Sequence, residues 1–475
     1  MIKIAVFIVY LVFIFCWGLY NSLKVKTEDD YIIAERKLPG WVSALSERAA
    51  GESAWALLGL PGFAYTFGLG AMWPAIGCVG GIITAWIFLS WRLRREAENY
   101  NVKTYIDYLS KRHKEVGHWI KLFGAITIVF FFTFYVGAQF LGGGKILHLL
   151  FEIDPIWGMI ISAIVILPYA AYGGFRSVVY VDVLQALLMI ATLVITPIAG
   201  LYYISTAPDV FSSSMFTALH ISGDKYTSIT GGFFGFSAGI FIASEFSWFF
   251  GYLGGLPQLS IRFMAIKNEK EAKIGRNIGV LWTIFAYIGA LLIGWIGISI
   301  FGPTSIEDPE YIMPSVVLKL FPPFIAALFI TGAVAAMLST ADSLIILTAT
   351  EMSESIIKPI TKRDLSIKIL RLITAMIALL ALLLVNILPS DLIYEIVGYV
   401  WAGIGCTFSV VILMTFFWEK FTSQAALTSI IVGLFFTILW IWTGLESFIS
   451  SRIMTFIITF IVAILSNLYF KKNTH

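Results

Sequence analysis

The chain has 475 residues, of which 59% are hydrophobic and 13% charged, and its formal net charge is +3. Water-soluble domains carry about 25% charged residues, so the composition excludes that class. The small positive charge is spread over many segments and gives no sign of a nucleic-acid partner. All three cysteines, Cys16, Cys78 and Cys406, stand in apolar stretches, so the sequence does not support a disulfide framework.

The apolar residues fall into thirteen runs, each close to the roughly 20 residues that span a bilayer as a helix. In chain order the runs lie at residues 3–22, 41–64, 70–91, 119–147, 156–172, 178–203, 229–252, 278–301, 322–349, 367–388, 392–417, 424–443 and 450–470. We therefore predict an all-α polytopic membrane protein with about 13 transmembrane helices. These helices form a single transmembrane domain over residues 1–475.

Lysine and arginine are retained preferentially on the cytoplasmic side of a membrane, and in this chain they gather in alternate loops. The rich loops are residues 22–40, 92–118, 253–277 and 351–366, and among their cations are Lys26, Arg262 and Arg363. The other loops hold little beyond Lys225, Lys319 and Arg452. This bias predicts a multi-pass protein of the cell (inner, cytoplasmic) membrane with the N-terminus outside and the C-terminus in the cytoplasm.

The second and seventh runs are interrupted by small and polar residues. Residues 49–53 read AAGES, and residues 239–257 hold four glycines and a proline. Non-helical backbone at membrane depth survives only where protein buries it or where it lines a wet cavity, so we predict two broken helices. They open two repeats of opposite orientation, 41–203 and 229–417, followed by C-terminal helices at 424–470, with ligands near the midplane. The alternative is that small residues only allow close helix packing.

Charged and hydroxyl side chains also stand inside the runs. The second run carries Glu47, Arg48 and Glu52, and the ninth carries Ser339, Thr340, Asp342 and Ser343. Hydroxyl, carboxylate and carbonyl oxygens are the hard ligands that Na+ prefers. Serine and threonine can also bond back to the i−4 carbonyl, but that leaves Asp342 unexplained. Because an acid within a span is by default functional, the ninth run predicts an ion site.

Five motifs carry a resemblance to a known family. They are SAWALLGLPG (53–62), FFFTFYVGAQFLGGGK (130–145), YGGFRSVVYVDVLQALLM (172–189), AAMLSTADSLIIL (335–347) and YVWAGIGCTFSVVIL (399–413). In order and spacing the chain resembles the sodium/solute symporter family from about residue 5 to about residue 465, and its proline-carrying members most closely. The resemblance implies a five-plus-five inverted repeat with flanking helices, and inward Na+ movement that drives uptake of a small organic solute.

The resemblance also implies the ion ligands. The principal Na+ site would use the backbone carbonyls of Ala49, Glu52 and Ala336 and the hydroxyls of Ser339 and Thr340. Some members of the family hold a further ion, for which the matching residues are Asp182 and Ser343, while Asp342 replaces another hydroxyl. Because of that replacement, the sequence does not decide whether a second sodium ion binds.

For the solute, the aromatic pocket of the proline-carrying members matches Trp55, Tyr135, Trp248 and Tyr252, and Gln258 stands close enough in sequence to contribute. Aromatic faces suit a small zwitterion with an apolar ring, whose carboxylate meets the positive end of a broken helix. Aromatic residues also serve as core residues and membrane-interface anchors. Only the motif match distinguishes these positions from that background.

The charges of the second run depart from the family pattern. The proline-carrying members have an aspartate where Gly51 stands, and apolar or small residues at Glu47, Arg48, Glu52 and Glu245. Buried unpaired charges are costly, so we expect a pairing network. Arg48 pairs with Glu52 if the helix continues, or reaches Glu245 if it unwinds. Alternatively, Arg48 binds the carboxylate of an organic acid.

We predict a Na+-coupled secondary active symporter that imports proline or a related amino acid by alternating access, and not an enzyme. A Na+-coupled carrier of small carboxylates is one alternative. Another is a proton-coupled carrier in which Glu52, Glu245 or Asp342 titrates. A transporter-like sensor is disfavoured because no signalling module follows the last run, and a channel because no filter repeat is present. The expected partners are the solute, Na+ and the lipid bilayer, with no obligatory protein partner.

Overall fold

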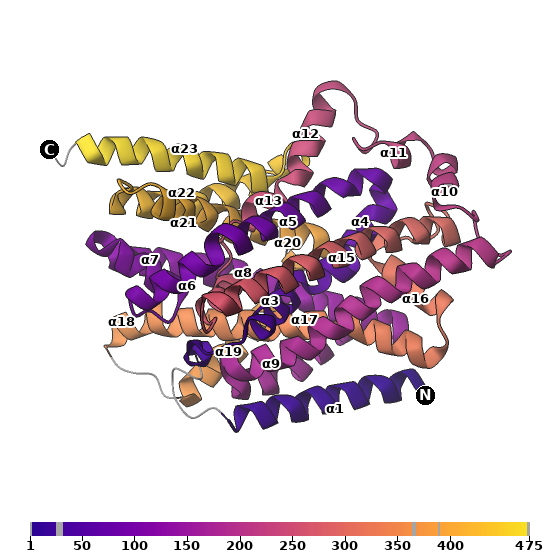
Figure 1. The fold of residues 1–475 in the computed structure, drawn as a ribbon, viewed down its shortest axis with the longest axis horizontal. Coiled ribbons are helices and arrows are strands. Elements are labelled where there is room, and N and C mark those ends of the chain that lie inside the picture. Colours follow the sequence, from indigo (N-terminus) through magenta and orange to yellow (C-terminus); the bar gives the residue numbers. More distant parts are fainter. Residues whose placement is uncertain (1, 25–31, 363–366, 388–389, 473–475) are drawn as a thin grey trace.

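The computed structural model describes residues 2–24, 32–362, 367–387 and 390–472. Lys26 and Arg363, two cations on which the predicted orientation rests, lie outside these ranges. The described residues form a bundle of helices with the two termini at opposite ends (Figure 1). No β-strand occurs within these ranges, although an isolated bridge joins Leu38 to Ile266. We call the end of the bundle that holds the N-terminus the N-face and the opposite end the C-face.

The first half of the chain contains α1 (Ile2–Ser22), α3 (Gly40–Ala54), α4 (Leu60–Phe67), α5 (Met72–Thr84), α6 (Ser90–Asn99), α7 (Tyr105–Arg112), α8 (Gly117–Phe151), α9 (Pro155–Thr206), α10 (Met215–Ser222) and α11 (Asp224–Thr227). The second half contains α12 (Gly235–Phe246), α13 (Trp248–Gly251), α14 (Pro257–Met264), α15 (Glu269–Phe301), α16 (Ile312–Leu320), α17 (Pro323–Glu351), α18 (Lys358–Thr361), α19 (Ile367–Leu384), α20 (Ile393–Val400), α21 (Thr407–Phe417), α22 (Ser423–Trp442) and α23 (Ser451–Lys472). Single π-helical turns join α3 to α4, α5 to α6 and α20 to α21.

Ten helical segments of the described chain are long and apolar enough to cross a membrane. The fold is thus an all-α polytopic bundle, as predicted, but the count of thirteen helices is not confirmed. Three differences account for the gap. The second and third runs follow each other without a non-helical gap over Gly40–Asn99 and count once, although Gly68, with φ 54°, separates α4 from α5. The fifth run forms the shorter apolar stretch Pro155–Leu167, and the seventh is divided among the short helices α12, α13 and α14.

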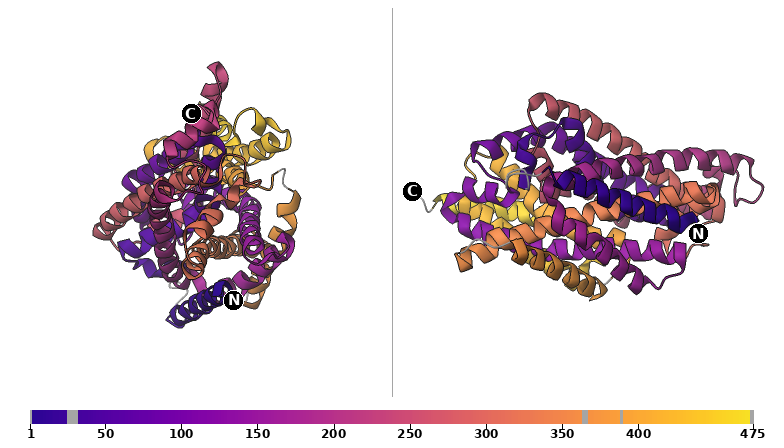
Figure 2. Two further views of the ribbon diagram at one scale, coloured as in Figure 1. Left: turned by 90° about the vertical axis from the view of Figure 1, so that its right-hand side faces the viewer. Right: turned by 90° about the horizontal axis from the view of Figure 1, so that it is seen from below.

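Burial separates central from peripheral helices. In the most apolar stretch of Pro323–Thr361, which contains α17, 83% of the residues are buried, and in Ile393–Phe417 the share is 94%. The corresponding shares are 11% for α1 and 22% for α23, which lie at the edge of the bundle (Figure 2). The exposed side chains of α1 and α23 are largely apolar, which suits contact with lipid rather than water.

Residues 253–277, predicted as a cytoplasmic loop, are largely helical. They contain α14, whose eight residues are all buried, and the beginning of α15. Residues 267–270 of this segment are exposed, whereas Arg262 is buried and paired with Asp182 inside the protein. Composition alone does not distinguish these two situations. The repeat boundaries at 41–203 and 229–417 stay a prediction.

Candidate functional site

The first broken helix changes direction at Ser53, which adopts φ 51° and ψ −163° between α3 and the π-helical turn Trp55–Gly59. The N–H of Ala54 donates to Oε1 of Gln139 on α8 at 3.2 Å. In an uninterrupted helix that N–H would donate to the carbonyl of Ala50. The break that the AAGES segment predicted therefore frees a carbonyl oxygen in the interior of the protein.

The central helix α17 meets this freed carbonyl. Oγ1 of Thr340 donates to the carbonyl oxygen of Ala50 at 3.3 Å, one residue beyond the predicted Ala49. Ala336, Ser339 and Thr340 are fully buried, and so are Ala49 and Glu52 on α3. The residues matched to the principal Na+ site thus lie on two helices in contact. Which oxygens ligate the ion stays a prediction.

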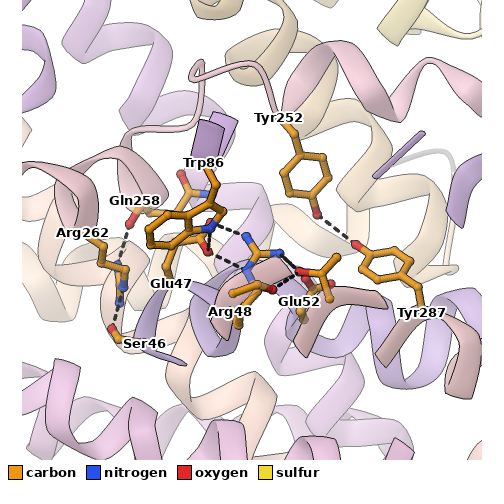
Figure 3. A network of polar contacts seen from close by, with 11 residues as sticks. Ser46, Glu47, Arg48, Glu52, Trp86, Tyr252, Gln258, Arg262 and Tyr287 are labelled. Carbon is orange, nitrogen blue, oxygen red and sulfur yellow. Dashed lines mark hydrogen bonds and ion pairs between the residues drawn. The ribbon is translucent and has the colours of Figure 1, made fainter. Parts of the chain in front are cut away.

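Glu47, Arg48 and Glu52 pair with one another; we call them the charge trio (Figure 3). Nη1 of Arg48 lies 2.6 Å from Oε1 of Glu52, and Nε lies 2.5 Å from Oε2 of Glu47, which Nε1 of Trp86 also reaches at 3.2 Å. The trio is at most 1% exposed. Its geometry is that of a helix continuing from Arg48 to Glu52, the first of the two expected arrangements. With both acids ionised, the trio carries one net negative charge.

Glu245 does not face Arg48, which corrects the second expected arrangement. Oε2 of Glu245 accepts a hydrogen bond from the hydroxyl of Tyr394 at 2.5 Å and lies 3.6 Å from Nη2 of Arg452 on α23. The two residues have different neighbours: Arg48 pairs with Glu52 on α3, whereas Glu245 on α12 lies against Tyr394 of α20 and Arg452 of α23.

The four aromatic residues predicted for the solute lie in one group of rings. The ring centroids of Trp55 and Trp248 are 4.5 Å apart, and those of Tyr135 and Tyr252 lie 5.5 and 5.4 Å from that of Trp401. We define the aromatic cluster as Trp55, Tyr135, Trp248, Tyr252, Tyr287, Tyr394 and Trp401. It stands between the break at Ser53 and the non-helical residues 252–256 that separate α13 from α14.

The candidate second ion site contains a protein cation. Asp182 and Ser343 both lie near Nη2 of Arg262, at 2.8 and 2.9 Å. Asp342 is fully buried on another side of α17, close enough to Tyr10 of α1 to interact with it electrostatically. Gln258 lies one turn before Arg262 and, with Ser343, lines a small cavity of about 40 Å³ rather than the aromatic cluster.

A larger cavity of about 700 Å³ lies toward the N-face. Its walls come from α4, α12, α20, the residues Pro309 and Glu310, and the segment between α22 and α23 with the start of α23. They include Phe63, Glu245, Tyr394 and Arg452. Tyr394 belongs to both this cavity and the aromatic cluster, so the cavity leads to the cluster. Toward the C-face, by contrast, Arg94 donates from Nε to the carbonyl of Ile266 at 2.5 Å, and the bridge from Leu38 to Ile266 joins the two broken-helix segments.

Sequence reasoning did not identify five residues of these sites: Arg262, Tyr287, Tyr394, Trp401 and Arg452. Trp401 falls within the motif YVWAGIG, so a signal for it was present. Arg262 and Arg452 were counted only as loop cations. Nothing in their local sequence reveals that each is at most 4% exposed and paired with an acid from another helix.

Comparison with known proteins gives consistent matches. The family profile described as "Sodium:solute symporter family" matches residues 31–433. The high-affinity proline transporter PutP of Bacillus subtilis is 33% identical over 92% of this chain and 92% of its own length. The osmoregulated proline transporter OpuE of the same organism is 31% identical over 98% of this chain and 94% of its own. Among solved structures, a Na+-coupled sialic acid symporter superposes with a TM-score of 0.78, covering 99% of this chain and 98% of its own at 18% identity.

Proposed function

Because the chain belongs to the sodium:solute symporter family, we propose that it imports a small zwitterionic amino acid together with Na+, and that proline or a close relative of proline is this solute. Two relatives named as proline transporters match nearly the whole chain. In alternating access, solute and ion reach a midplane site first from one face and then from the other. The N-face is then the extracellular side of the cell membrane, and the cavity of about 700 Å³ is the entry route.

The observation that carries this proposal is the aromatic cluster between the two helix breaks. The rings offer flat apolar faces for a saturated ring and an attractive surface for a cationic nitrogen. The indole Nε1 atoms of Trp55 and Trp401 are buried and have no hydrogen-bond partner among the described residues. An unpaired buried donor costs about 1–3 kcal/mol, and a solute carboxylate would supply the acceptor that both donors lack.

The contacts of Arg48 favour a zwitterion over an organic acid. An arginine has five N–H groups, and Arg48 directs Nε and Nη2 to Glu47 and Nη1 to both Glu52 and Thr283. Little donor capacity remains for a solute carboxylate. With both acids ionised, the net negative charge of the trio instead favours a cation nearby. It takes over, in our proposal, the role of the aspartate that Gly51 replaces.

Ligand-induced thermal stabilisation of the purified protein tests the solute class, because a ligand that binds only the folded state raises Tm. We expect L-proline to raise Tm in NaCl and not in KCl, and proline amide and cyclopentane carboxylate, which each lack one charge, to have little effect. A response to the carboxylate alone would favour the organic-acid carrier. A proline response that ignores Na+ and follows pH would favour proton coupling.

Two variants test the carboxylate contact. Trp55→Phe and Trp401→Phe keep a ring but remove the unpaired N–H. Each should weaken proline binding about tenfold or more, since hydrogen bonds to charged groups contribute about 1.5–3 kcal/mol. Trp295→Phe is the matched control, because its Nε1 donates to the carbonyl of Gly68 at 2.9 Å, outside the cluster. Unchanged proline affinity in both cluster variants would remove the carboxylate contact from the proposal.

A further inference from the structure

The number of Na+ ions per solute depends on the site around Asp182. Asp182 is fully buried, and Arg262 is 1% exposed. Oδ2 of Asp182 accepts hydrogen bonds from Ser46 Oγ at 2.6 Å and from Arg262 Nη2 at 2.8 Å, while Oδ1 accepts one from the hydroxyl of Ser339. Both carboxylate oxygens are therefore engaged within the protein.

The guanidinium of Arg262 stands among the oxygens that a second sodium ion would need. Besides Asp182, its Nη2 donates to Ser343 Oγ at 2.9 Å, its Nε to Ser46 Oγ at 2.7 Å and its Nη1 to the carbonyl of Gln258 at 2.5 Å. Arginine keeps its charge under all ordinary conditions. Two cations sharing one carboxylate in a buried site repel each other strongly, so Na+ does not bind here while Arg262 is in place.

The same contacts link this site to the principal Na+ site. The hydroxyl of Ser339, which is matched to the principal site, donates a hydrogen bond to Asp182. Its oxygen lone pairs are therefore available to a cation on the other side. Ser46 comes from α3, Asp182 from α9, Arg262 from α14 and Ser339 from α17. The cluster thus ties both broken-helix segments together on the C-face side of the break at Ser53.

We propose that Arg262 is the resident cation of the second ion site and limits this carrier to a single Na+ per solute. The inference rests on the proposed Na+-coupled transport and specifies its stoichiometry. In this proposal Arg262 determines how many sodium ions bind per solute, and it does so through its positive charge rather than through its packing contacts. Replacing the charge should therefore change how many sodium ions bind, whereas replacing packing contacts nearby should not.

The test compares the wild-type protein with Arg262→Gln, Arg262→Lys and Arg94→Gln in proteoliposomes. The Hill coefficient for Na+ reaches at most the number of coupled sites, so we expect about 1 for the wild type and for Arg262→Lys, and a rise toward about 2 for Arg262→Gln. Arg94→Gln is the matched control, because Arg94 is a buried arginine that anchors the end of α14 through Ile266 without touching Asp182. Its Hill coefficient should stay that of the wild type.

A wild-type coupling ratio of two Na+ per solute, measured by the solute gradient that balances a known Na+ gradient, would overturn the inference. A folded Arg262→Gln with an unchanged Hill coefficient would overturn it as well. If Arg262→Gln does not fold, the wild-type ratio alone decides. Failure of the proposed transport function is distinguishable from failure of this inference, because it would appear as the absence of Na+-driven solute uptake. Ion number is then still read from the Na+ dependence of Tm, which is about twice as steep for two ions as for one.

Discussion

The guanidinium carbon of Arg452 lies 4.4 Å from the centroid of the Trp248 ring. Arg452 also donates from Nε to Oγ of Ser247 at 3.2 Å and from Nη2 to the carbonyl of Ser244 at 3.1 Å. Ser244 lies in the last turn of α12, and Ser247 links α12 to Trp248, the first residue of α13. The peripheral helix α23 therefore fixes the position of a ring in the aromatic cluster.

Arg452→Gln should raise the KM for the solute and leave kcat and the Na+ half-saturation concentration unchanged. A desolvated cation–π contact contributes about 2 kcal/mol to holding the ring, so the loss of solute affinity is at most about 30-fold. Arg452→Lys, which keeps a cation but not the bonds to Ser244 and Ser247, should fall between the wild type and Arg452→Gln. Initial uptake rates at varied solute concentration provide the measurement. A loss of kcat with unchanged KM would show that Arg452 acts on folding or on the conformational cycle instead.

Thr340→Ala and Ser339→Ala should each raise the Na+ half-saturation concentration about tenfold or more, since a hydroxyl bound to a charged partner contributes about 1.5–3 kcal/mol. Uptake measured over a range of Na+ concentrations checks this. Thr331→Ala is the control on the same helix, because its hydroxyl donates to the carbonyl of Ala327 at 2.6 Å and faces no proposed ion. If all three variants respond to Na+ as the wild type does, the principal site lies elsewhere.

Arg48→Gln should lower the free energy of unfolding by about 3–5 kcal/mol, because it leaves Glu47 and Glu52 buried without their cation. Adding Glu47→Gln to that variant should restore part of the loss, since the repulsion between two acids disappears. Thermal unfolding in detergent, analysed as a double-mutant cycle, measures this coupling. The exposed pair of Glu269 and Lys273 at 3.0 Å is the control, and Lys273→Gln should cost about 0–1 kcal/mol. Purely additive effects of Arg48→Gln and Glu47→Gln would argue against a coupled trio.

His113 should make stability depend on pH. It follows α7 outside the membrane-spanning helices, it is 2% exposed, and its Nε2 lies 2.9 Å from Oγ1 of Thr415. Burial, together with the neighbouring charge of Arg112, lowers the pKa of His113 from 6.5 to about 4. Between these values the unfolded chain binds a proton that the folded protein does not, so this contribution to stability is intact above about pH 6.5 and decreases toward pH 4.

The expected loss across that pH range is roughly 3 kcal/mol, at 1.36 kcal/mol for each pKa unit. Thermal unfolding of the wild type and of His113→Gln between pH 7 and pH 4 measures it, since glutamine offers an uncharged donor to Thr415. The variant should show a smaller fall in stability than the wild type. Identical pH profiles for the two proteins would remove His113 as the source.

Local sequence was sufficient for features that depend on nearby residues. The AAGES segment predicted a helix break, and the break lies at Ser53 within it. The spacing of Arg48 and Glu52 predicted a pair along one helix, and that pair is present. The aromatic residues matched by the family resemblance, such as Trp55 and Trp248, lie together in the structure.

Ion pairs between helices that are distant in sequence could not be predicted from the sequence alone. Arg262 finds Asp182 across 80 positions, and Arg452 lies against Glu245 of another helix. Both arginines resemble loop cations in composition, because a charge that is neutralised inside the protein and a charge that is solvated look alike in a list of residues. Whether Glu245 met Arg48 or another cation depended on how α3, α12 and α23 pack, which only the tertiary structure defines.

Uptake of labelled L-proline into proteoliposomes tests the central claim most directly, with an inward Na+ gradient compared against an equal inward K+ gradient. The account predicts accumulation above the external concentration with the Na+ gradient and only equilibration with K+. Equal uptake under both gradients would contradict Na+ coupling. No proline uptake in protein whose Tm still rises with Na+ would contradict proline as the solute.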